Sequence, residues 1–287
     1  MVLRQQVINE VIINMTLDRN GIYVAGDSLD VRSVELEIRD RIAKEAPRDF
    51  SKLLEEVAHH HSIQVMEEEL QKFIDRIPIG GVVVDVGAGW GWHWCGLGKY
   101  RSDVVVILVD FSHESLLRAM EVLSGENPES FVYVCGDAQR LHIADESVDG
   151  YWSVQTLQHV PDFELAVQEA KRILRPDGQF ASYSLSNQPV LRTIVKMLKR
   201  PYVTDGFFSE GIWLRRASES QRECIDSIFG SRSEERYSEV LFTPELHLSR
   251  PGASGSRLGR LDRKLTGHSL FARLFARQCS YHIAKVA

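Results

Sequence analysis

The segment Asp85-Val86-Gly87-Ala88-Gly89-Trp90-Gly91 carries the residue types best suited to hold a small ligand. Three glycines at alternate positions follow a run of valines that is interrupted by a single acid. Glycine lets the backbone adopt unusual dihedral angles and approach a ligand without a β-carbon in the way. The segment therefore predicts a tight turn beside the carboxylate of Asp85, leading into a helix that begins near Gly91.

The spacing of these glycines separates two kinds of ligand. Dinucleotide-binding loops read G-x-G-x-x-G and seat a pyrophosphate on a helix N-terminus, whereas this loop reads G-x-G-x-G, with Asp85 two residues ahead of Gly87. A carboxylate would repel a pyrophosphate, but it suits S-adenosylmethionine, which carries an amino acid end and a sulfonium. We therefore expect S-adenosyl-L-methionine as cofactor, and a nicotinamide-dependent oxidoreductase is the less favoured alternative.

Regularly alternating elements surround this loop between residues 80 and 185. Apolar, β-branched runs alternate with amphipathic helical stretches, which is typical of a parallel sheet covered on both faces. This pattern predicts an α/β fold with a doubly wound, mostly parallel, Rossmann-like sheet. The expected strands are Val82-Val86, Val104-Val109, Phe131-Cys135, Val148-Val154 and Gln179-Leu185, and the expected helices are Ser112-Leu123 and Phe163-Leu174.

This pattern predicts that the chain divides into three parts. Residues 1–78 form an N-terminal extension and helices that cover the cofactor site, residues 79–187 form the Rossmann-like core, and residues 188–287 form an acceptor-binding cap. Helical periodicity runs from Asp49 to Ile77, and it includes three consecutive histidines at 59–61 that imply no metal. The cap contains a helix at Val190-Leu198 and a closing strand at Ser280-Val286.

Further motifs in the core give the sequence a family resemblance. From Gly80 to Asn187 it resembles the class I S-adenosylmethionine-dependent methyltransferases, particularly the branch that includes the ubiquinone and menaquinone biosynthesis methyltransferases. The aromatic run at 90–94 departs from that family, which usually has small or polar residues there. The matching motifs, in the family's order, are the glycine loop, Asp110 closing the second strand, Gly136-Asp137-Ala138, the strand Ser147-Val154, Leu157-Gln158-His159-Val160-Pro161-Asp162 and Leu174-Arg175-Pro176-Asp177-Gly178.

The resemblance implies a role for each matching residue. The glycine loop would wrap the methionine moiety, Asp110 would accept hydrogen bonds from both ribose hydroxyls, and Asp137 would accept one from the adenine amino group. The expected cofactor-binding residues are Asp85, Gly87, Ala88, Gly89, Asp110, Phe111, Asp137, Ala138, Ser153 and Val154.

The one candidate catalytic residue is His159, a general base in this interpretation. A lone histidine after a strand is as readily a packed or capping residue. Methyl transfer often needs only alignment of the acceptor with the sulfonium, so a dedicated base is optional. The rings of Trp90, Trp92 and Trp94 suit contact with a sulfonium cation, although alternate positions at the start of a helix do not share one face.

Composition excludes several classes of protein. The chain is 44% hydrophobic and 26% charged, it has no apolar run near the roughly 20 residues that span a bilayer, and Met1–Asn14 lacks the apolar core of a signal peptide. We therefore expect a cytoplasmic protein. Its four cysteines are scattered, so we expect no metal site. The family branch implies a small-molecule, sugar or lipid-linked acceptor, and no motif for nucleic acid is present.

A basic segment near the C-terminus needs a separate explanation. Residues 250–277 contain seven Lys or Arg against the single acid Asp262, and leucines and phenylalanines recur between them. The favoured interpretation is a pair of helices that pack their apolar sides on the domain. The alternatives are contact of residues 257–277 with an anionic membrane surface, an anionic acceptor, or a partner of a catalytically inactive, methyltransferase-like scaffold subunit.

Overall fold

Five buried strands form the centre of the sheet in the computed structural model, which describes residues 4–25, 33–45, 60–209, 211–242, 248 and 255–286. They are β3 (Val82–Val86), β4 (Val105–Asp110), β5 (Phe131–Cys135), β6 (Val148–Val154) and β7 (Leu174–Leu185), and neighbouring strands pair in parallel. Every residue of β3, β4 and β5 is buried, because helices cover both faces. The predicted Rossmann-like α/β sheet is confirmed. Four of these strands coincide with a predicted run to within one residue, whereas β7 begins at Leu174, five residues before the predicted Gln179.

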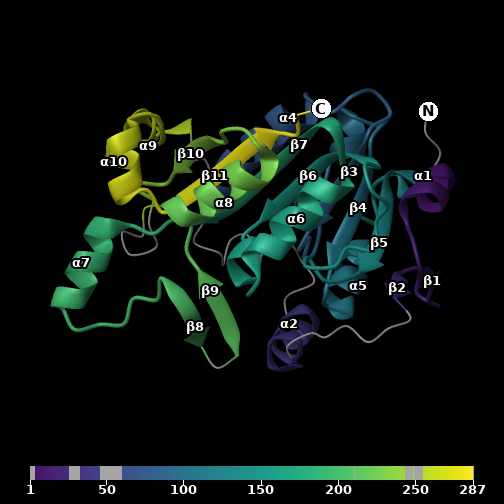
Figure 1. Ribbon diagram of the computed structural model, residues 1–287, viewed down its shortest axis with the longest axis horizontal. Helices are drawn as coiled ribbons and strands as arrows, with labels where there is room; N and C mark the ends of the chain where they lie inside the picture. Colours follow the sequence, from purple (N-terminus) through teal and green to yellow (C-terminus); the bar gives the residue numbers. More distant parts are fainter. Residues whose placement is uncertain are drawn as a thin grey trace.

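Strands from both ends of the chain extend this sheet to nine, in the order β1-β2-β5-β4-β3-β6-β7-β11-β10 (Figure 1). A hairpin of β1 (Met15–Leu17) and β2 (Tyr23–Ala25) joins β5 at one edge. At the other edge, β11 (Gln278–Ala284) lies antiparallel to β7, and β10 (Glu234–Ser238) lies antiparallel to β11. One sheet thus runs through all three parts of the chain, and β11 overlaps the predicted closing strand.

Two helical layers cover the sheet, one on each face (Figure 1). Alternate strand residues pack against α1 (Arg4–Val11), α6 (Phe163–Ile173) and α8 (Glu219–Phe229) on one face. The intervening residues pack against α4 (His60–Ile74) and α5 (His113–Val122) on the other. The period of two along each strand therefore divides the core into two clusters. His59 and the side chains of His60 and His61 lie outside the described residues.

The helix expected from Gly91 onward is wrong. Two single-turn 3₁₀-helices follow the glycine loop instead, η1 (Trp92–Trp94) and η2 (Leu97–Lys99). Gly96 separates them with a φ of +84°, outside the range of a right-handed helix. The Trp94 side chain is drawn fully into the core, and this tertiary anchor overrides the local helical tendency.

The remaining elements lie outside the two layers. Helix α2 (Ser33–Glu45) packs beside α5, and α7 (Pro189–Met197), α9 (Arg257–Thr266) and α10 (Ser269–Phe275) gather at the end of the molecule away from the N-terminus (Figure 1). A two-stranded hairpin, β8 (Asp205–Ser209) with β9 (Ile212–Arg215), extends from the main sheet. Within the described residues, no helix has the length and apolar character needed to cross a bilayer.

Candidate functional site

A cavity opens where β3, β4, β5 and β6 end at the same edge of the sheet. Carboxyl ends of parallel strands are where doubly wound folds bind ligands. The structure brings six of the predicted site residues together in this cavity. It is lined by Gly87, Asp110, Phe111, Asp137, Ala138 and His159 from the prediction, and by Glu35, Val86, Gly136, Gln139, Thr156, Val160 and Pro161 in addition.

Gly87, at the start of the glycine loop, lines the cavity, whereas Ala88 and Gly89, which the sequence also placed in the site, do not. The shape of the loop depends on two of its glycines. Gly87 has a φ of +72°, and a β-carbon there would lie 1.9 Å from Thr156 Oγ1. Gly89 has a φ of +54°, and its β-carbon position meets no atom within 4 Å. The amides of Gly87 and Ala88 both donate to the carbonyl of Val109, at 2.7 and 3.1 Å. These two hydrogen bonds therefore hold the loop against β4, and the position of a β-carbon on Gly89 is open space.

Asp110 ends β4 with its carboxylate held in a fixed orientation. Oδ2 accepts from the amide of Gly89 at 2.9 Å, and Oδ1 accepts from the amide of Ser112 at 2.9 Å. Burial raises the pKa of Asp110, and these two backbone bonds oppose the rise. Each carboxylate oxygen can accept more than one hydrogen bond, so both oxygens keep acceptor capacity for a ligand.

Asp85 does not line the cavity, although the sequence placed it in the site. Its side chain is buried beneath the loop, where Oδ2 accepts from the indole Nε1 of Trp94 at 2.8 Å. Burial raises the pKa of Asp85 to about 7, the Trp94 bond opposes this rise, and the charge of Asp110 adds to it. Asp85 thus supports the loop from below in this structure.

The three tryptophans also lie outside the residues that line the described cavity. The guanidinium of Arg118 lies 5.8 Å from the centre of the Trp90 ring, and the Trp92 ring packs on His93. Trp94 is fully buried against Asp85. Trp94 is therefore closed to a ligand, and Trp90 and Trp92 are half-buried beside the protein's own side chains.

Asp137 and its neighbours close the cavity beside β5. The Oδ1 of Asp137 accepts from the amide of Gln139 at 2.9 Å, and Gln139 Nε2 lies 3.1 Å from Oδ2. Ser153 and Val154, in contrast, do not line the cavity. The Ser153 hydroxyl is buried and donates to the carbonyl of Val86 at 2.9 Å, so it holds β6 to the start of the glycine loop.

His159 lines the cavity with both ring nitrogens engaged. Nδ1 lies 2.5 Å from the carbonyl of Trp213 on β9, and Nε2 lies 3.1 Å from Nε2 of Gln158. The Gln158 amide is oriented by its Oε1, which accepts from the Leu185 amide at 2.7 Å, so its nitrogen donates to His159. A neutral ring with its proton on Nδ1 satisfies every bond. His159 therefore ties the β8–β9 hairpin to the cavity.

Two lining residues missed from the sequence come from segments without a recognisable motif. Glu35 lies on α2 and is almost fully buried, next to Arg39 of the same helix. Thr156 precedes the short helix that carries His159, and its hydroxyl lies 3.2 Å from the carbonyl of Gly87. Gly87 was the one signal in the sequence for a close neighbour at the position that Thr156 occupies. Tertiary packing alone brings Glu35 to this cavity.

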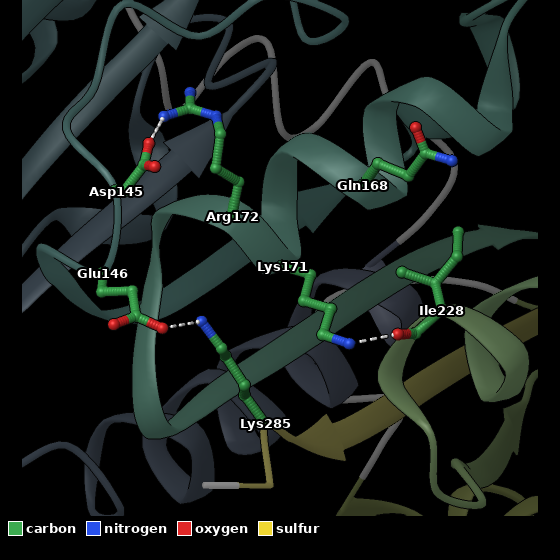
Figure 2. Close-up of a pocket in the computed structure, with 7 residues that line it drawn as sticks. All are labelled: Asp145, Glu146, Gln168, Lys171, Arg172, Ile228 and Lys285. Carbon is green, nitrogen blue, oxygen red and sulfur yellow. Dashed lines mark hydrogen bonds and ion pairs between the residues drawn. The ribbon is translucent and has the colours of Figure 1, made fainter.

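A second pocket lies at the other end of the strands, beside the start of β6 and the end of β11 (Figure 2). Its charged groups are engaged with one another or with the backbone. Lys285 Nζ lies 2.9 Å from Glu146, Arg172 lies 2.6 Å from Asp145, and Lys171 Nζ donates to a backbone carbonyl at 2.5 Å. These contacts tie α6, α8 and the end of β11 together, which indicates a structural role for these charged groups.

Comparison with known proteins identifies the core. Residues 84–182 match the profile of the family described as Methyltransferase domain. Over these residues, about a third of the chain, the sequence is similar to that methyltransferase domain. The match runs from Val84 in β3 to most of β7 and includes the carboxyl ends of all four strands that form the cavity.

Two curated relatives share this methyltransferase domain. The ubiquinone/menaquinone biosynthesis C-methyltransferase UbiE of Caulobacter vibrioides is 28% identical over 129 residues, which are 44% of this chain and 48% of the relative. Methyltransferase GfsG of Streptomyces halstedii is 32% identical over 123 residues, which are 40% and 41% of the two chains. The chain thus spans less than half the length of either relative.

Solved structures share the fold over a larger part of the chain. The geranyl diphosphate C-methyltransferase of Streptomyces coelicolor, solved with S-adenosyl-L-homocysteine, matches with a TM-score of 0.52 and 12% identity, covering 78% of this chain and 76% of that one. The [4+2]-cyclase SpnF matches with a TM-score of 0.52 and 17% identity, covering 78% and 82%. At such identities these matches establish the fold alone, and the cyclase illustrates that this fold hosts more than one chemistry.

Proposed function

We propose that this chain is an S-adenosylmethionine-dependent methyltransferase that acts on a small-molecule, sugar or lipid-linked acceptor. The observation that carries the proposal is Asp110, a buried carboxylate that ends the strand beside the glycine loop and faces the cavity of a methyltransferase domain. Two backbone amides fix its orientation. A carboxylate held in this way is suited to accept hydrogen bonds from the two hydroxyls of a ribose.

The residues present fit S-adenosylmethionine. The open space at the β-carbon position of Gly89 leaves the loop accessible to a ligand, and Asp137 offers carboxylate oxygens farther along the same cavity. Asp110 would hold the ribose, Asp137 and Phe111 the adenine, and the glycine loop the methionine moiety. When bound, the cofactor supplies an electrophilic methyl group on a sulfonium.

Acceptor activation in this proposal rests on alignment. Alignment of nucleophile and methyl group supplies much of the rate acceleration, and the Nε2 of His159 already accepts a bond from Gln158. An acceptor hydroxyl would have to displace that bond before His159 could take its proton. His159 in our proposal positions the β8–β9 hairpin through the carbonyl of Trp213. This hairpin belongs to residues 188–287, which would provide the acceptor pocket. Residues 1–78 would cover the cofactor.

Calorimetric titration of the full chain with S-adenosylmethionine and S-adenosylhomocysteine tests the cofactor assignment. A hydrogen bond to a charged group contributes about 1.5–3 kcal/mol, so Asp110→Asn should weaken binding by roughly 10-fold to 100-fold. Asp75→Asn is the matched control, because this exposed acid lies just beyond α4, outside the residues that line the cavity. Circular dichroism checks that each variant is folded.

Transfer of a labelled methyl group to candidate acceptors tests turnover. Saturable binding that Asp110→Asn weakens, followed by labelled product, is the expected result. A folded wild-type chain that binds neither form of the cofactor would refute the proposal and favour the nicotinamide alternative. Binding without transfer to any acceptor would favour the inactive scaffold subunit.

A further inference from the structure

Helices α7 and α10 contact each other at one end of the molecule (Figure 1), and both carry exposed apolar side chains. Helix α7 buries none of its nine residues. Met197 is 78% exposed, Leu198 follows it at 64%, and Leu270 at the start of α10 is 74% exposed. Exposed apolar side chains on two helices that contact each other are typical of an interaction site in a soluble domain.

Cations flank the exposed apolar side chains at the end of α7. Residues 187–204 contain four Lys or Arg and no acid, and three of the four, Lys196, Lys199 and Arg200, are exposed. Asp262 is the single acid between residues 251 and 277. It is buried, and its Oδ1 accepts from the amides of Val240 and Leu241 at 2.9 and 2.6 Å. Its charge is therefore directed into the protein. Arg263, Arg273 and Arg277 pair with Glu68, Glu219 and Glu239, so the cations of this surface are those at and just after the end of α7.

We propose that this surface docks on an anionic lipid bilayer. We call it the α7/α10 surface and define it by Met197, Leu198 and Leu270 with Lys196, Lys199 and Arg200. Exposed apolar side chains flanked by cations match the acyl boundary and the phosphates of an anionic leaflet. A symmetric contact between two copies would bring the same cations against each other, which disfavours a dimer. The inference does not depend on the proposed function.

Cosedimentation of the full chain with vesicles tests the proposal. Vesicles of phosphatidylcholine mixed with phosphatidylglycerol should bind the protein, vesicles of phosphatidylcholine alone should bind it weakly, and added salt should reduce binding through screening. Each cation near an anionic surface contributes about fivefold to partitioning. The variant Lys196→Glu with Lys199→Glu should therefore lower partitioning by at least about 25-fold.

A second variant tests the apolar contribution. Met197→Ser with Leu270→Ser should also weaken binding, and because both side chains are largely exposed the change should leave the fold intact. The matched apolar control is Leu17→Ser with Ile79→Ser, which are 56% and 94% exposed on other parts of the molecule.

The matched charge control is Arg19→Glu with Lys99→Glu, two exposed cations on the β1–β2 hairpin and on η2. Binding to anionic vesicles that is lost in both surface variants and kept in both controls supports the proposal. A folded wild-type chain that does not bind anionic vesicles overturns it, and so does equal loss in variants and controls. A molar mass in light scattering that falls from dimer to monomer in the surface variants, without vesicle binding, would assign the surface to a second copy instead.

Discussion

Replacement of Asp85 by Asn isolates the electrostatic cost of burying this acid. Burial raises its pKa from 3.8 to about 7 in the folded chain. Below about pH 4 the folded and unfolded states are both protonated, so the acid has no effect on pH dependence. Between about pH 4 and 7 only the unfolded state loses the proton, and the free energy of unfolding falls as the pH rises. At about 1.36 kcal/mol per pKa unit, the loss reaches at most about 4 kcal/mol above pH 7.

Asparagine removes this titration and keeps an oxygen that can accept from the indole of Trp94. The stability of Asp85→Asn relative to wild type should therefore increase by up to about 4 kcal/mol between about pH 4 and pH 8. Urea denaturation of the cofactor-free chain, followed by far-UV circular dichroism at several pH values, measures this change. The test uses the change with pH in the difference between the two free energies of unfolding, so any pH-independent cost of the new amide group cancels.

The control for this experiment is Asp177→Asn. Asp177 is exposed and has a φ of +64°, a conformation that asparagine tolerates equally well. Its pH profile should run parallel to that of wild type. If the profile of Asp85→Asn also runs parallel to wild type between pH 4 and 8, the reasoning on burial is refuted.

Three other substitutions test the loop, a helix cap and the far edge of the sheet. Gly87→Ala should lower stability by several kcal/mol and abolish cofactor binding in calorimetry, because its β-carbon would overlap Thr156. Gly89→Ala, whose β-carbon has open space, should cost only about 1–2 kcal/mol of stability. Similar losses of stability in the two variants would refute the steric argument. Ser112→Ala removes the hydroxyl that caps α5 and bonds a carboxylate of α2, so urea denaturation should give a loss of about 1–2 kcal/mol, and no loss would contradict the assigned cap. Lys285→Met leaves a buried backbone carbonyl without its bond at 2.7 Å, which should cost about 1–3 kcal/mol; an unchanged melting temperature would contradict it.

The sequence by itself determined the central sheet. Its β-branched runs are continuous because parallel strands covered on both faces need apolar residues at every position, so strands such as β3 and β5 begin and end where the hydropathy pattern changes. The ends of parallel strands located Asp110, and the family resemblance located Asp137. Gly87 and Gly89 were also identified, because glycine in such a turn reflects a local backbone requirement.

Tertiary structure decided what each of these residues faces. Asp85 was indistinguishable in the sequence from an acid that contacts ligand, and only the burial of Trp94 against it turned its carboxylate away from the cavity. Glu35 reached the cavity through packing of α2 beside α5, across a separation that no local pattern records. The exposure of the apolar side of α7 was likewise invisible in its sequence. Periodicity fixes which residues share a face, but the contact that buries or exposes that face depends on distant parts of the chain.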